Sequence, residues 1–145
     1  MIAEDGLIKA GKNLTYSSTA LAYLGDAVLE LLVREMLLRT GISNSGTLNT
    51  MAQDYVRATA QSRGAEKLFP YLTEEEKTIY RRGRNAGGNH PKSATAVEYR
   101  RATGFEALFG ALYIRGQHNR IRELFNLFAD REDVLHDTEY EQKEK

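Results

Sequence analysis

The sequence predicts an all-α domain, and three observations lead to this prediction. Apolar residues recur at helical spacing in several long segments, and no useful stretch alternates polar and apolar residues as a strand does. The two prolines fall between these segments, at positions 70 and 91. A chain of 145 residues with 41% hydrophobic content fits one domain with a single core. We assign that domain to residues 14–129.

Five helices are expected along the chain. The first begins at Ser17 or Ser18, either of which is a suitable N-cap, and ends near Arg39, before a stop signal at Gly41. The third has three glutamates in its first turn, where they favour the helix dipole. Gly, Asn, Pro and Ser in NAGGNHPKSAT predict a loop before the fourth helix. The second to fifth helices are expected at residues 47–63, 73 to 82–84, 95–115 and 117–129.

Charge is balanced over the chain but unevenly distributed. Lys+Arg and Asp+Glu both total 20, so the net charge gives no indication of a partner. Residues 81–101, however, hold six Lys or Arg and a single acid, Glu98. A neutral protein with one basic segment is a candidate for binding an anion there. Residues 130–145 hold seven acids against three basic residues, and we expect an acidic, disordered tail.

Composition also excludes several classes of protein. The chain has no cysteine, which excludes a disulfide framework and a cysteine-based metal site. The N-terminal MIAEDG contains acids and no apolar signal region. No apolar run approaches the roughly 20 residues that span a bilayer. We therefore expect a cytoplasmic protein with no membrane partner.

Two strongly apolar helices each contain an embedded acid. In LAYLGDAVLELLV, residues 21–33, Asp26 stands in a helix that is apolar almost all round and should be buried on most sides. Glu30 can instead pair with Arg34 on the helix surface. In ATGFEALFGALYI, residues 102–114, the acid is Glu106, with no Lys or Arg three or four residues away. We expect the aromatic residues of these segments to lie in the core: Tyr23, Phe105 and Phe109.

The two acids predict a metal site if their helices cross. Small residues in the fourth helix, including Gly104 and Gly110, indicate that a neighbouring backbone approaches closely. Two converging carboxylates need a cation between them, and oxygen ligands with room for water suit Mg²⁺ or Mn²⁺. A structural alternative remains open, because a buried acid is often satisfied by backbone N–H groups or by a distant arginine.

Both segments resemble motifs of the ribonuclease III family. YLGDAVLE, residues 23–30, and TGFEALFGALY, residues 103–113, are similar to the two acidic motifs of that family and occur in its order. RRGRNA, PK and YR.AT.FEAL, between residues 81 and 108, are similar to the Mini-III group, which lacks the double-stranded-RNA-binding domain. The resemblance covers residues 14–129, and the short acidic tail that follows fits that group. Two acids of the larger family are absent, since Ala22 and Thr103 stand in their places.

The resemblance implies a homodimeric helical domain of the ribonuclease III endonuclease type that cleaves double-stranded RNA and leaves 5′-phosphates. Asp26 and Glu106 would be the catalytic and metal-binding residues, with Mg²⁺ as cofactor and Mn²⁺ able to substitute. It also implies maturation of precursor 23S ribosomal RNA, with a ribosomal helper protein as a further partner. The basic segment supplies the candidate RNA-binding residues: Arg81, Arg82, Arg84, Asn85, His90, Lys92, Arg100 and Arg101.

Two alternatives stay open at this point. The acids missing at Ala22 and Thr103 also fit a catalytically silent protein of the same fold that only binds RNA, for example at the ribosome. A helical regulator or scaffold with no role in nucleic-acid chemistry is the second alternative, with Asp26 and Glu106 serving structure alone.

Overall fold

The chain is described by a computed structural model that covers residues 16–86 and 95–130. All regular secondary structure in these two ranges is helical, which confirms the all-α prediction. His90, Lys92 and nearly all of the predicted tail lie outside the described residues. The elements in chain order are α2 (Ser18–Leu38), α3 (Ser45–Val56), α4 (Ala58–Leu68), the 3-10 helix η1 (Phe69–Tyr71), α5 (Glu74–Ala86), α6 (Ala96–Ile114) and α7 (His118–Ala129).

Side-chain caps fix the starts of three predicted helices. The Ser17 hydroxyl accepts a hydrogen bond from the Ala20 N–H at 3.1 Å, so Ser17 is the cap that begins α2. At α5 the Thr73 hydroxyl and the Glu76 carboxylate each accept from the other residue's backbone N–H. The capping box at α6 is formed in the same way by Thr95 and Glu98. These reciprocal bonds satisfy N–H groups that the first turn of a helix leaves without partners.

The prediction of one helix over residues 47–63 is wrong. The chain breaks at Arg57, where ψ is 149°, and a separate α4 runs on to Leu68. The break turns both helices toward α7. The ring of Tyr55 meets that of Phe128 edge-on at 6.3 Å, and a Cβ on Gly64 would lie 2.4 Å from the Phe128 ring. Residues on both sides of the break thus pack against Phe128, and no Gly or Pro at Arg57 marks the place in the sequence.

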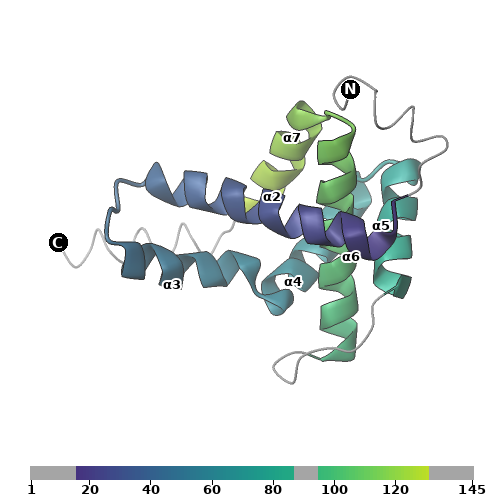
Figure 1. Ribbon diagram of the computed structural model, residues 1–145, viewed down its shortest axis with the longest axis horizontal. Helices are drawn as coiled ribbons and strands as arrows, with labels where there is room; N and C mark the ends of the chain where they lie inside the picture. Colours follow the sequence, from purple (N-terminus) through teal and green to yellow (C-terminus); the bar gives the residue numbers. More distant parts are fainter. Residues whose placement is uncertain (1–15, 87–94, 131–145) are drawn as a thin grey trace.

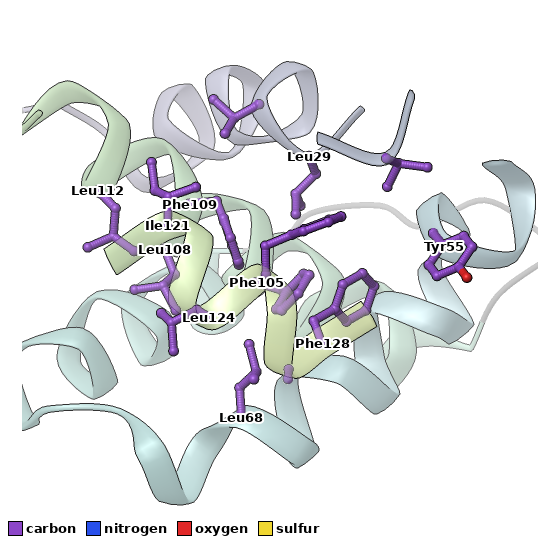
Figure 2. Close-up of a cluster of buried hydrophobic side chains, with 14 of the residues drawn as sticks. Leu29, Tyr55, Leu68, Phe105, Leu108, Phe109, Leu112, Ile121, Leu124 and Phe128 are labelled. Carbon is purple, nitrogen blue, oxygen red and sulfur yellow. The ribbon is translucent and has the colours of Figure 1, made fainter. Parts of the chain in front are cut away.

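Helix α6 is the centre of the fold. In Figure 1, α2 runs across α6, α5 lies along another side of it, and α3 returns beside α2. Figure 2 shows the core that these helices enclose around Phe105, Phe109 and Phe128. The Phe105 ring centre lies 5.0 Å from each of the other two. Phe105 and Phe109 are 1% and 0% exposed, which confirms their predicted place in the core.

Two glycines allow α2 and α6 to touch along their backbones. A Cβ on Gly25 would lie 1.7 Å from the Glu106 carbonyl oxygen, and one on Gly110 would lie 2.0 Å from the Leu21 carbonyl oxygen. This contact confirms the close approach that the small residues of the fourth helix predict. It also places Asp26, the residue after Gly25, beside the turn of α6 that carries Glu106.

Neither α2 nor α6, nor any other helix in the described ranges, has both the length and the apolar character needed to cross a membrane.

Candidate active site

Asp26 and Glu106 face one another across the glycine contact. Asp26 is exposed at the surface of α2, whereas Glu106 is half-buried on α6. The two carboxyl groups are close enough to interact both by charge and by a hydrogen bond. The convergence that the sequence predicts is therefore present in the fold.

The position of Glu106 changes its acidity. Burial, together with the charge and the hydrogen bond of Asp26, raises the pKa of Glu106 from an ordinary 4.5 to about 8. Without a cation, Glu106 thus holds its proton at neutral pH. A group with such a shifted pKa at a surface-accessible position marks a candidate functional site.

The protein supplies no positive charge to this pair within the part of the chain that the structure describes. No ion pair there joins Lys or Arg to Asp26 or Glu106. Both acids stand in the middle of a helix, where backbone N–H groups are already used. By contrast, Glu30 pairs with Arg34 at 3.8 Å, as its spacing predicts. The structural explanation of the two acids therefore has no support among these residues.

The donor set fits a hard divalent cation. Two carboxylates with no cationic partner offer oxygen ligands to Mg²⁺ or Mn²⁺, and such ions keep several waters. No group of three or more His, Cys, Asp or Glu side chains gathers within residues 16–86 and 95–130. Thr103, in the place of a family acid, gives its hydroxyl hydrogen to the Tyr99 carbonyl oxygen at 2.9 Å. The site is thus a two-carboxylate site that water and substrate oxygens would complete.

The outer face of α2 departs from the prediction. Tyr23, expected in the core, is 85% exposed, and Leu31 on the same face is 63% exposed. The contact at Gly25 turns Val28, Leu29 and Val33 inward, and the opposite side of the helix is left exposed by the residues that the structure describes. Tyr23, Ala27 and Leu31 recur every four residues and form one apolar stripe.

Several basic residues gather around a hollow between α5 and the start of α6. This arginine hollow has a volume of about 470 Å³ and is lined by Arg84, Asn85, Val97, Arg100 and Arg101. The Arg84 guanidinium lies 5.9 Å from the centre of the Tyr80 ring, and its Nε donates to Asn85 Oδ1 at 3.4 Å. Four of the eight predicted RNA-binding residues therefore meet at one place.

The other candidates are arranged differently. Arg81 and Arg82 are exposed on α5 and do not line the hollow, and Arg81 lies 5.4 Å from the centre of the Phe69 ring. Arg101 forms an ion pair with Glu66 of α4. Sequence reasoning missed Glu66, because 35 residues separate it from Arg101 and no local pattern connects them.

Comparison with known proteins identifies the class. Residues 19–117 match the Ribonuclease III domain. The chain belongs to the ribonuclease III family, and it is an endoribonuclease. The family assignment removes the scaffold alternative, and the helical fold is that of the family's endonuclease domain.

The similarity extends to the Mini-III group. The chain is 49% identical over 118 residues to Mini-ribonuclease 3 of Symbiobacterium thermophilum, covering 81% of this chain and 91% of that protein. It is 43% identical over 110 residues to Mini-ribonuclease 3 of Enterococcus faecalis, covering 74% and 83%. A crystal structure of a Fusobacterium nucleatum protein superimposes with a TM-score of 0.76 at 36% identity, covering 81% and 97%. These matches confirm the predicted resemblance to Mini-III.

Proposed function

We propose that this endoribonuclease cleaves double-stranded RNA with Asp26 and Glu106 as its metal-binding and catalytic residues. The observation that carries the proposal is the approach of two carboxyl groups, neither of which is paired with a Lys or Arg side chain in the described structure. Exposed Asp26 faces the solvent from which the RNA backbone arrives, and half-buried Glu106 must release its proton to act as a ligand. When bound, Mg²⁺ or Mn²⁺ would lower the pKa of a water and neutralise charge on the phosphate, giving 5′-phosphate products.

The arginine hollow is proposed to hold the RNA backbone. Arg100 stands six residues before Glu106 on α6, a rise of roughly 9 Å, so one duplex can contact both. A-form RNA is bound mainly through its shape, its phosphates and its 2′-hydroxyls, which suits arginine and asparagine side chains. The sequence alone assigns His90 and Lys92 to this proposed RNA-binding surface.

Replacing both Arg84 and Arg100 with Ala should weaken RNA binding by at least about tenfold at low salt and lower the salt slope by about two. Both side chains line the hollow, so both phosphate contacts are lost together. Fluorescence anisotropy in chelator, with a short RNA duplex at several KCl concentrations, measures the affinity without cleavage.

The matched control replaces Arg39 and Arg122 with Ala. It removes the same charge near α7 and the far end of α2, beside a different hollow. Equal affinity in the Arg84 and Arg100 variant and the control would move the RNA interface elsewhere.

We also propose that the apolar stripe of α2 is the interface of a homodimer. Tyr23 and Leu31 are exposed in the single chain, and the stripe has no charged residue at its centre. A helix face of this kind can pack on its own copy about a two-fold axis. Burying it would explain why α2 is apolar on the side that the core does not use.

Leu31→Glu should convert the dimer to a monomer, because the charge would lie buried against its own symmetry mate. Light scattering after size exclusion measures the mass. Tyr71→Glu is the control, since Tyr71 is also 59% exposed but lies on η1 rather than on α2. A wild-type chain that is monomeric at micromolar concentration would contradict the dimer.

For the cellular substrate we propose precursor 23S ribosomal RNA in the cytoplasm. The support is the similarity to the Mini-III group and the small arginine-lined hollow in the described part. A small basic surface binds weakly, which is why a ribosomal helper protein is included in the proposal. Mapping the ends left on a structured precursor, with and without large-subunit proteins, tests both points.

A further inference from the structure

Arg101 differs from the other arginines of the hollow. It forms an ion pair with Glu66, which reaches it from α4. The Glu66 and Arg101 side chains are 58% and 37% exposed, so the pair lies at the open rim where solvent reaches it. Exposed ion pairs contribute little to stability and exchange partners readily. A phosphate that enters the hollow therefore competes with Glu66 for Arg101.

The charge of Glu66 also acts on Tyr80, the buried ring that Arg84 packs against. Burial raises the pKa of the Tyr80 hydroxyl, the charges of Arg84 and Arg101 lower it, and the charge of Glu66 raises it further. One phenol thus lies within range of all three charges. Glu98, the other acid near the start of α6, is engaged with Thr95 in the capping box. Glu66 is therefore a carboxylate paired with an arginine that lines a site otherwise suited to phosphate, although Glu66 does not itself line the hollow.

We propose that Glu66 is an electrostatic brake on RNA binding at the arginine hollow. It neutralises Arg101 in the free enzyme and repels the phosphate that displaces it. The inference rests on the proposed role of the hollow in binding RNA. Its consequence is a lower affinity and faster release of duplex RNA than the arginines alone would give, which favours product release after cleavage.

Glu66→Gln tests the brake. The amide keeps the shape of the side chain and removes its charge, which frees Arg101. We expect the dissociation constant for a short RNA duplex to fall by about threefold to tenfold near 50 mM KCl, and the salt slope to steepen by about one. The measurement is fluorescence anisotropy of the full chain in chelator.

Glu75→Gln is the matched control. Glu75 also forms an ion pair between helices, with Arg115 at the far end of α6. Fourteen residues, a rise of roughly 21 Å, separate Arg115 from Arg101, which exceeds the Debye length of about 14 Å at 50 mM salt. The control changes the net charge equally and should leave the salt slope unchanged.

A double-mutant cycle sharpens the result. Arg101→Ala should weaken binding less than Arg100→Ala in the wild-type background, because Glu66 already neutralises Arg101. In the Glu66→Gln background the two arginine substitutions should have similar effects. If Arg101→Ala weakens binding by the same factor in the wild-type and the Glu66→Gln backgrounds, Glu66 and Arg101 are not coupled in RNA binding. That result would overturn the proposal.

The remaining outcomes are also decisive. Unchanged affinity of Glu66→Gln overturns the brake, and weaker binding makes Glu66 a residue that positions Arg101 for the phosphate. If replacing Arg84 and Arg100 with Ala also has no effect, the proposed RNA surface has failed together with the brake. If that double variant weakens binding while Glu66→Gln does not tighten it, only the brake has failed.

Discussion

Asp26→Asn and Glu106→Gln should each lower cleavage of long double-stranded RNA in Mg²⁺ by at least about a thousandfold. Each substitution removes one of the two carboxylates that converge at the site in the described part of the chain, and an amide is a poor substitute for a metal-binding carboxylate. Initial rates on labelled duplex RNA, resolved by denaturing gel, measure the loss.

Glu30→Gln is the control for this loss. Glu30 lies one turn from Asp26 on the same helix, but its charge is paired with Arg34 on the surface. We expect its cleavage rate to stay within a few-fold of wild type. Cleavage by Asp26→Asn at the wild-type rate would disprove the assignment of the site, and inactivity of the wild type itself would support the catalytically silent alternative.

In chelator, the stability of the wild-type chain should fall as the pH rises from 4.5 to about 8. Across this window the folded chain keeps the proton on Glu106 and the unfolded chain has lost it, so rising pH favours unfolding. One pKa unit corresponds to about 1.36 kcal/mol, so the whole window corresponds to about 5 kcal/mol. Because solvent reaches this half-buried pair and screens it, we expect a total loss on the order of 2–4 kcal/mol. Urea titrations at a series of pH values give the free energy of unfolding.

Glu106→Gln should remove this slope and be more stable than wild type at the upper end of the window. Mn²⁺ should restore stability to the wild type, because a cation favours the ionised carboxylates, and should give Glu106→Gln no comparable gain. Glu76 does not interfere. Burial raises its pKa, but hydrogen bonds from Arg120 and Thr73 outweigh burial and lower it, so its stabilising effect is lost only in more acidic solution. A flat profile for the wild type, or an equal Mn²⁺ gain in both chains, would contradict the paired-acid site.

The features that the sequence predicted correctly are those with local causes. The caps at Ser17 and Thr95 follow from the preference of hydroxyl groups for helix starts, and the contact near Gly110 follows from side chains too small to hold two backbones apart. The meeting of Asp26 and Glu106 followed from one further assumption, that the two apolar helices cross at their acids.

The errors have causes outside the local pattern. The residues on both sides of the break at Arg57 pack against Phe128, which is far away in the sequence, and no Gly or Pro at Arg57 signals the break. Tyr23 is expected in the core because its neighbours in the sequence are apolar, yet it is exposed. A helix can also have an apolar face that is exposed in the single chain and covered by a partner. No sequence pattern indicates that Glu66 pairs with Arg101, because only the fold brings the two residues together.

Main-chain atoms set the separation of the two acids. The Leu21 and Glu106 carbonyls rest against Gly110 and Gly25, so the spacing does not depend on how neighbouring side chains interlock. Truncating a core residue such as Leu124 should therefore reduce the fraction of molecules that are folded while leaving the turnover of each folded molecule intact. The geometry of the catalytic site and the thermal stability of the fold can then change independently among relatives. Thermal stability can therefore be engineered without altering the catalytic site.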